Sequence, residues 1–187
     1  MSLIYIQKVK VNQAAFEAKV RQISNLLGID PNWLMIIMNF ESGGTFNPAI
    51  VNPVGGATGL IQFMPATAKG LGTTTAALAK MSNVEQLNWV HKYYSLKAGK
   101  FKSGEDLYLY NFFITAVGKP DSFVIESKNL KASTIAKQNP AFDLNKDGQI
   151  TVGEWRVALR KILTKLIKDK SILDMFFEKK NSDRRIF

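Results

Sequence analysis

The sequence predicts a mainly α-helical protein built around one hydrophobic core. Apolar residues recur at the three- and four-residue spacing of amphipathic helices in several segments. The 187 residues, 46% of them hydrophobic, are enough to bury one core, and the absence of cysteine excludes a disulfide framework and thiol chemistry. We therefore expect one helical domain followed by a smaller C-terminal extension.

The charge balance favours an anionic partner. The chain has 25 Lys and Arg against 15 Asp and Glu, a formal net charge of +10, which suits nucleic acid, an anionic membrane or the bacterial cell wall. Its first ten residues carry only a short apolar patch at residues 3–6, without a long apolar run or a small-residue cleavage site. We expect neither a signal peptide nor a membrane anchor there.

Two helices are predicted near the start of the chain. The first spans residues 11–28, and its apolar residues share one face: Phe16, Val20, Ile23, Leu26 and Leu27. The second begins at an N-cap, Asp30, with Pro31 in its first turn, continues through the apolar residues 33–40, and ends at residues 42–44. We expect these two helices to pack against each other.

Glu41 is the candidate catalytic residue at the end of the second helix. It follows Ile37 and Met38 by one turn, so it projects from the same apolar face. Desolvation there and the partial negative charge at the helix C-terminus both raise the expected pKa of its carboxyl. A neutral carboxylic acid near pH 7 can protonate a glycosidic oxygen. An isolated Glu in this position is more often a partly exposed helix-end acid, so the neighbouring residues decide.

Those neighbours carry a family resemblance. Glu41-Ser42 is followed by Phe46-Asn47-Pro48 and then by ATGLIQFMPATA at residues 57–68. This ordered block resembles the catalytic signature of the soluble-type lytic transglycosylases, peptidoglycan-cleaving enzymes with a goose-type lysozyme fold. The resemblance implies a lysozyme-like (goose-type/SLT) helical catalytic domain at residues 1–120.

The resemblance also implies roles for single residues. Glu41 corresponds to the catalytic acid, Ser42 to a substrate-contacting hydroxyl, and Gln62 to the glutamine of the family's Gly-Leu-Met-Gln motif. Two features depart from the pattern: Ile61 replaces the Met, and residues 43–45 lengthen the loop after Ser42. We expect residues 60–68 to form a helix that carries Gln62.

Three further helices are expected before residue 120. Residues 73–75 read as a loop or N-cap before a short helix at residues 76–81, and residues 84–98 form an amphipathic pattern. His91 in that pattern has no second histidine or cysteine at metal-ligand spacing, so we expect it in packing or at the surface. Residues 106–117 are strongly apolar and suit a buried helix or strand, and their length favours the helix.

Tyr110-Asn111 lies in this apolar segment. The transglycosylase resemblance implies that the pair borders the catalytic cleft and binds substrate, although Phe112-Phe113 replaces the small residues that usually follow. A tyrosine hydroxyl near Glu41 would orient the acid or hold a sugar. The alternative is a core aromatic residue whose hydroxyl is satisfied locally.

A different motif follows at residues 143–154, DLNKDGQITVGE, which fits the EF-hand calcium loop. Calcium takes six to eight oxygen ligands, and a short loop can surround it only if it turns sharply. Asp143, Asn145 and Asp147 are expected to supply side-chain oxygens. Gln149 would supply its backbone carbonyl, Thr151 an oxygen directly or through water, and Glu154 both oxygens of its carboxylate. Gly148 permits the turn and Ile150 points into the core. The alternative is a plain Asx-rich turn.

We expect residues 121–187 to form a single EF-hand-like helix-loop-helix extension packed on the same core. Asn139-Pro140 falls where the entering helix should run, so we expect that helix either to be short or to begin at the proline. Because a lone loop lacks the usual EF-hand partner, Ca²⁺ is predicted to be structural, holding a helix at residues 155–168 on the catalytic core. Residues 156–180 are basic and amphipathic, which suits a docked exit helix, a membrane surface or an anionic wall polymer. Residues 181–185 are expected to fray.

The distribution of acidic residues bears on the reaction. Glycoside hydrolases of both stereochemical classes need a second carboxylate, yet no acidic residue lies between Glu41 and Glu85, and Glu105 and Asp106 are remote candidates. A single acid resembles transglycosylase chemistry: Glu41 protonates the bond between N-acetylmuramic acid and N-acetylglucosamine, then acts as base while the muramoyl 6-hydroxyl closes a 1,6-anhydro ring. A hydrolytic lysozyme, a non-catalytic calcium-dependent wall-binding module and a calcium-regulated membrane-interaction scaffold are the alternatives.

The resemblance also sets expectations for partners and location. The expected partner is the peptidoglycan glycan strand, with no nucleic acid and no stable membrane insertion, and the chemistry needs no cofactor. We expect a monomer that acts on the bacterial cell wall, in the periplasm, outside the cell or delivered by a phage.

Overall fold

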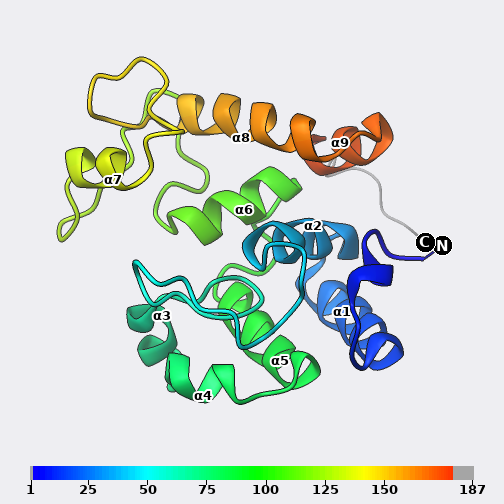
Figure 1. Cartoon of the computed structure of the whole chain (residues 1–187). Helices are drawn as coiled ribbons and strands as arrows, with labels where there is room; N and C mark the ends of the chain where they lie inside the picture. Colours follow the sequence, from blue (N-terminus) through cyan, green and yellow to red (C-terminus); the bar gives the residue numbers. More distant parts are fainter. Residues whose placement is uncertain (1, 179–187) are drawn as a thin grey trace. The chain divides into compact units, whose positions relative to one another are not determined.

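The computed structural model describes residues 2–178, which are mainly helical as predicted (Figure 1). Within this range β pairing is limited to isolated bridges. In chain order the elements are the 3-10 helix η1 (Ile6–Lys8) and the α-helices α1 (Gln13–Leu27), α2 (Pro31–Glu41), α3 (Pro65–Gly70), α4 (Thr75–Ala79), α5 (Asn83–Ser95), α6 (Gly104–Phe112), α7 (Ala132–Gln138), α8 (Val152–Leu166) and α9 (Lys170–Phe177).

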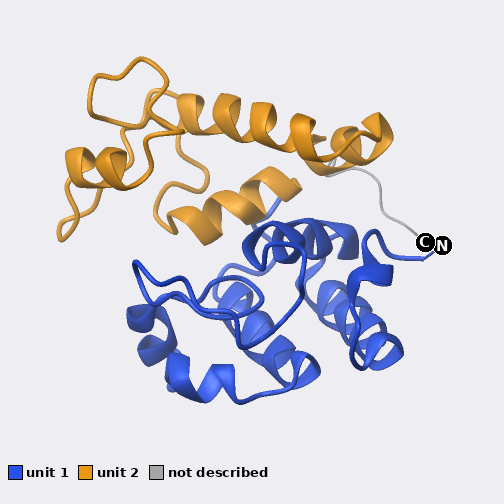
Figure 2. Ribbon diagram, viewed as in Figure 1, with its two compact units in different colours: residues 1–102 blue, residues 103–187 orange. Residues whose placement is uncertain are grey.

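The chain forms two compact units, one ending at Lys102 and one beginning at Ser103 (Figure 2). The second unit contains α6 together with α7, α8 and α9. The predicted domain boundary at residue 120 therefore falls inside this unit, after α6. That residues 1–120 form the catalytic domain stays a prediction.

The core of the first unit forms where α1 packs against both α2 and α5. The predicted start of α2 is confirmed, because the Asp30 side chain accepts a hydrogen bond from the Asn32 N–H and Pro31 occupies the first turn. Gly28 ends α1 with a left-handed φ of 68°, which glycine adopts without strain. The largest side chains buried in this unit include Phe16, Trp33 and Tyr94.

The helix predicted at residues 60–68 is wrong in its first half. Residues 59–62 form a turn, closed by Thr58 and Phe63, whose N–H groups each donate to the other's carbonyl at 3.0 and 2.9 Å, and α3 begins only at Pro65. Gly59 has φ 85° and Gln62 has φ 54°, both outside the helical region. Leu60, Ile61 and Phe63 are buried although they are not helical. A run of buried apolar residues occurs in helices and in buried turns, so the sequence pattern did not distinguish the two.

The second unit departs from the predicted boundaries at two points. α6 ends at Phe112 rather than at residue 117, because Phe113 is extended at φ −156° and ψ 98°. The predicted basic segment 156–180 is two helices, because Ile167 is extended and Asp169 caps α9. Its last two residues and the predicted frayed end at 181–185 lie outside the described residues. Among the described residues, none of the helices is long and apolar enough to cross a membrane.

The ends of α6 and α9 meet closely inside the second unit. α6 packs against α9, and a Cβ added at Gly104 would lie 2.4 Å from the Phe176 ring. This close approach requires glycine at the start of α6. The requirement fixes which part of α6 faces α9.

Candidate active site

Glu41 is the last residue of α2 and is half-buried. Ile37 and Met38, one turn earlier, are both fully buried, as the sequence predicts for that face. Glu41 therefore ends the helix one turn after two fully buried residues. The expected rise in its pKa stays a prediction.

Ser42 organises the loop that follows Glu41. Its side chain is fully buried, and its hydroxyl donates to the Met38 carbonyl at 2.6 Å and accepts from the Phe46 N–H at 2.9 Å. The Thr45 hydroxyl donates to the Ser42 carbonyl at 2.7 Å. Ser42 thus joins the end of α2 to the lengthened loop, and its predicted contact with substrate stays a prediction.

Gln62 is held in its turn by its own side chain. The carboxamide Nε2 donates to the Gly59 carbonyl at 3.1 Å and to the Ile50 carbonyl at 3.4 Å, and the Gln62 N–H also donates to the Gly59 carbonyl at 3.2 Å. The side chain remains half-buried. Its carboxamide oxygen is an acceptor available to orient a polar ligand.

Gln86 is the residue that sequence reasoning missed. It lies on α5, is fully buried, and binds three backbone groups: the Leu60 N–H at 2.7 Å, the Pro48 carbonyl at 3.0 Å and the Leu78 carbonyl at 3.0 Å. A signal for it exists in the sequence, because Gln86 interrupts the apolar stripe of α5 and a buried amide needs partners.

The comparison with protein families falls on this same segment. Residues 19–90 match the family model of the transglycosylase SLT domain. The matched SLT segment includes Glu41, Ser42, Gln62 and Gln86 and ends within α5. It supports the soluble-type transglycosylase and lysozyme-like family, whose proteins act on the cell wall. No match was found among curated proteins or among solved structures.

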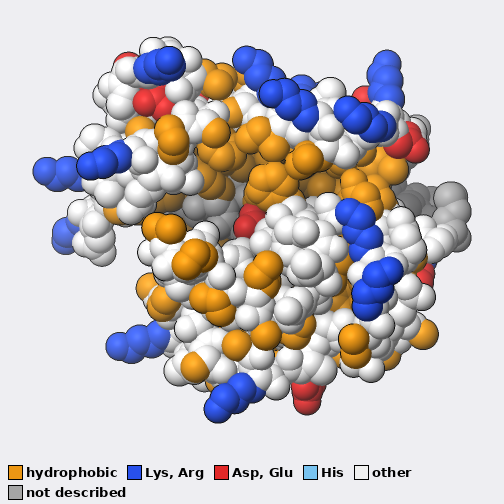
Figure 3. Space-filling model, viewed as in Figure 1, with side chains coloured by type: hydrophobic (Ala, Val, Ile, Leu, Met, Phe, Trp, Pro, Cys, Tyr) orange, Lys and Arg blue, Asp and Glu red, His pale blue; other side chains and the backbone are white. Residues whose placement is uncertain are grey.

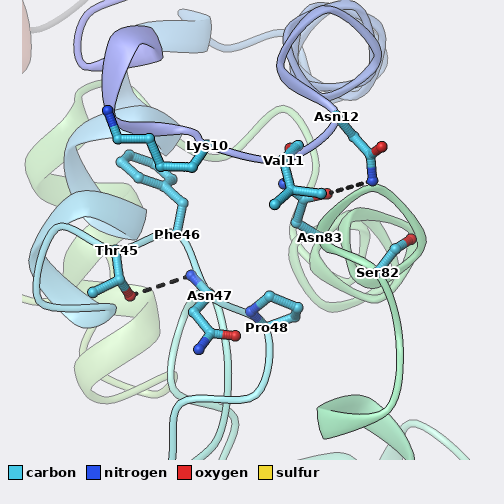
Figure 4. Close-up of a pocket in the computed structure, with 9 residues that line it drawn as sticks. All are labelled: Lys10, Val11, Asn12, Thr45, Phe46, Asn47, Pro48, Ser82 and Asn83. Atoms are coloured by element: carbon cyan, nitrogen blue, oxygen red, sulfur yellow. Dashed lines mark hydrogen bonds between the residues drawn. The ribbon is translucent and has the colours of Figure 1, made fainter.

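A pocket of about 210 Å³ lies within the first unit (Figure 4). Its wall combines the connection before α1, the start of α5 and the loop after Ser42, which contribute Lys10, Val11, Asn12, Thr45, Phe46, Asn47, Pro48, Ser82 and Asn83. The Asn12 carboxamide donates to the Asn83 carboxamide oxygen across it at 3.4 Å. None of the predicted site residues lines this pocket.

Tyr110 and Asn111 lie on α6, in the second unit and beyond the SLT segment. Tyr110 is fully buried, and burial raises the pKa of its hydroxyl, while Asn111 is half-buried. The structure thus assigns Glu41, Ser42 and Gln62 to one unit and the Tyr-Asn pair to the other. The role of the pair in substrate binding stays a prediction.

The predicted calcium loop follows α7, which is short and ends at Gln138; of the two expected alternatives, a helix that begins at Pro140 is therefore wrong. Gly148 has φ 82° and allows the sharp turn, and Ile150 is fully buried. The Ile150 carbonyl accepts from the Ile125 N–H at 2.8 Å, and Val124 forms an antiparallel bridge with Thr151. A short segment of this unit therefore pairs with the loop where a second EF-hand loop usually would.

The ligand side chains of this loop bind one another and its backbone. Asp143 Oδ2 accepts from the Gly148 N–H at 3.1 Å, and the Asn145 carboxamide donates to Asp147 Oδ2 at 3.0 Å. Glu154 Oε2 accepts from the Thr151 N–H and hydroxyl at 3.0 and 2.9 Å, which completes a capping box for α8. No group of three acidic, histidine or cysteine side chains converges as a metal site within the described residues.

One atom of the loop stands apart. Asp143 Oδ1 is buried, and it has no hydrogen-bond partner within residues 2–178. A buried carboxylate oxygen without a donor is costly, and a cation would satisfy it. The donor set is composed of oxygen atoms, which are the ligands that Ca²⁺ takes.

Two other features complete the second unit. The Arg156 guanidinium on α8 lies 3.5 Å from Glu105 and 3.9 Å from Asp106 at the start of α6, and also pairs with Asp121. On the face shown in Figure 3, Lys and Arg side chains gather over α8, where Arg160, Lys161 and Lys165 are exposed. Binding of this face to a membrane or an anionic wall polymer stays a prediction.

Proposed function

We propose that this protein is a peptidoglycan lytic transglycosylase in which Glu41 is the general acid and base. The observation that carries the proposal is the position of Glu41, half-buried at the end of α2 inside the SLT segment. Ile37 and Met38, one turn before Glu41, are fully buried, and partial desolvation of Glu41 would favour the protonated form, which can protonate a glycosidic oxygen.

The roles of the neighbouring residues follow from their hydrogen bonds. Ser42 holds the loop after α2 and so fixes the direction of the residue next to it, Glu41. Gln62 presents a polar carboxamide from a rigid turn in the same unit, which suits a bond to a sugar hydroxyl or N-acetyl group. Tyr110 and Asn111 are proposed as further glycan contacts on the strength of the resemblance.

The reaction proposed is an intramolecular transfer. Glu41 donates its proton to the bridging oxygen as the bond between N-acetylmuramic acid and N-acetylglucosamine breaks. The resulting carboxylate then removes the proton of the muramoyl 6-hydroxyl as that oxygen bonds to the anomeric carbon and closes the 1,6-anhydro ring. The absence of any acidic residue from position 42 to 84 supports this single-acid route over hydrolysis.

The experiment that tests the reaction is mass spectrometry of glycan products released from purified peptidoglycan. A transglycosylase leaves 1,6-anhydro-N-acetylmuramic ends and incorporates no oxygen from ¹⁸O-labelled water. Reducing ends carrying ¹⁸O identify a hydrolytic lysozyme instead. Tight binding to peptidoglycan without release of any product identifies a non-catalytic wall-binding module.

We also propose that the loop at residues 143–154 binds one structural Ca²⁺. The buried, unpartnered Asp143 Oδ1 and the left-handed Gly148 support this proposal. Asp143, Asn145 and Asp147 would supply side-chain oxygens, Gln149 a carbonyl oxygen and Glu154 its carboxylate, released from Thr151. The ion would hold the start of α8 in place and takes no part in glycan cleavage.

A further inference from the structure

Gln86 and Gln62 bind the two ends of one peptide group. The Leu60 N–H and the Gly59 carbonyl belong to the same planar peptide unit. Gln86 Oε1 accepts from the Leu60 N–H at 2.7 Å. On the other end of the unit, the Gly59 carbonyl accepts from Gln62 Nε2 at 3.1 Å and from the Gln62 N–H at 3.2 Å.

Gln86 is itself fixed on every polar side. Its Nε2 donates to the Pro48 carbonyl and to the Leu78 carbonyl, both at 3.0 Å, so both carboxamide protons are used. The side chain is fully buried on α5, a helix of the packed core. Its carboxamide plane therefore has one orientation, and that orientation sets the direction of the Leu60 N–H.

Gly59 makes this close approach possible. A Cβ at position 59 would lie 2.3 to 2.7 Å from the Gln86 carboxamide atoms, and the residue has φ 85°. Backbone and carboxamide therefore fit only with glycine at this position. A rotation of the 59–60 peptide plane would break the bond to Gln86 and the bonds to Gln62 together, because the plane is rigid.

We infer that Gln86 is a positioning residue that fixes the Gln62 carboxamide through the 59–60 peptide unit. The inference rests on the proposed function, since it assigns Gln86 to the glycan-binding turn of that site. Gln62 touches the glycan, and Gln86 acts only through it. Once Gln62 has been replaced, replacing Gln86 as well should therefore lower kcat/KM little further.

The test is a double-mutant cycle on the full chain with Gln86→Met, Gln62→Ala and the pair. Methionine keeps the length of the side chain and removes its polar atoms. We expect Gln86→Met to lower kcat/KM, and the double variant to fall within about twofold of Gln62→Ala alone, because coupled residues are not additive. Multiplied losses in the double variant would overturn the inference and leave Gln86 a purely structural residue.

Asn83→Ala is the matched control. Asn83 is a buried amide on the same helix, and its carboxamide donates to the Val11 carbonyl at 2.8 Å instead of to a residue of the 59–62 turn. It should lower the melting temperature as Gln86→Met does. Its effect on kcat/KM, if any, should multiply with that of Gln62→Ala.

A second readout does not depend on turnover. In ¹⁵N NMR spectra of the full chain, Gln86→Met should shift the Gln62 side-chain amide resonances and Asn83→Ala should leave them in place. A folded Gln86→Met protein with unshifted Gln62 resonances overturns the inference. If Gln86→Met fails to fold, couplings across the Leu60–Gln86 and Gln62–Gly59 hydrogen bonds in wild-type protein decide: their presence supports the inference and their absence refutes it.

These readouts separate the two proposals. Equal inactivity of wild-type and Glu41→Gln protein on peptidoglycan would refute the proposed function, while the NMR measurement would still decide whether Gln86 positions Gln62. An active wild type whose Gln62 resonances ignore Gln86 would refute only the inference.

Discussion

Phe142 and Trp155 stack with ring centroids 6.1 Å apart and an interplanar angle of 12°. They stand immediately outside the two ends of the 143–154 loop. Phe112, next to Asn111 on α6, contacts both rings, with centroids 5.2 Å from Phe142 and 5.8 Å from Trp155. The residues that flank the predicted calcium loop therefore pack against the end of α6 that carries the Tyr-Asn pair.

Calcium should change the environment of Trp155 because the ion draws the ends of the loop together. We expect Ca²⁺ titration to change the tryptophan fluorescence of the full chain and to raise its melting temperature. At 100 times the dissociation constant, binding adds about 2.7 kcal/mol to the free energy of unfolding. Asp143→Ala should abolish both effects, whereas Asp174→Asn, an exposed change on α9, should abolish neither.

Trp155→Phe is a control for the signal itself. The chain has three tryptophans, and this variant keeps a ring in the stack while removing the reporter. It should bind Ca²⁺ by calorimetry but lose the fluorescence change. Calorimetry showing no Ca²⁺ binding to wild-type protein would end the calcium proposal.

Ser42→Ala should destabilise the first unit. The substitution leaves the Phe46 N–H without its acceptor, 2.9 Å away in wild type, in a buried position. A buried unsatisfied donor costs about 1–3 kcal/mol, which chemical denaturation measures directly. Ser95→Ala removes a hydroxyl that donates to the His91 carbonyl at an exposed helix end, and should cost almost nothing. Unchanged stability with a raised KM for Ser42→Ala would instead mean that the hydroxyl contacts substrate.

Glu105 should make stability fall as the pH rises above its unfolded pKa. Burial raises the pKa of the Glu105 carboxyl from 4.5, and Arg156 only partly opposes the rise. The folded state then holds the proton more tightly than the unfolded state, so stability is lost between pH 4.5 and the raised pKa. We therefore expect the free energy of unfolding of the wild type, relative to that of Glu105→Gln, to decrease as the pH rises through this range.

Glu85 gives the opposite sign and serves as the control. Hydrogen bonds from Ser82 lower the pKa of its carboxyl below 4.5. Its stabilising contribution is present above pH 4.5 and is lost as the pH falls through the lowered pKa. A Glu105→Gln difference that runs in the same direction as that of Glu85→Gln would contradict the assignment for Glu105.

Local signals in the sequence predicted α2 well. Asp30, Pro31 and the apolar run specify the start of this helix through contacts between near neighbours, so a reading of the sequence finds them. The catalytic candidate follows, because Glu41 comes directly after that run. The loop-forming role of Ser42 became visible only with its inward hydrogen bonds.

The turn at residues 59–62 could not be predicted from local sequence signals. Its apolar residues suit a helix or a buried turn equally, and the choice is made by Gln86, which lies 26 residues from Leu60 in the sequence. Pattern and structure also differ at the end of α6, where Phe113 leaves the helix although its apolar neighbours continue the pattern. Long-range hydrogen bonds and packing overrule local preference at such sites.

Glu41 is central to the proposed reaction, and the most direct test is the rate of glycan-strand cleavage by Glu41→Gln compared with wild type. Removing a general acid lowers the rate by about 100- to 10,000-fold. We predict a loss of that size with an unchanged melting temperature, and 1,6-anhydro ends in the wild-type products. Cleavage by folded Glu41→Gln protein at a rate close to that of wild type would show that Glu41 is not the general acid.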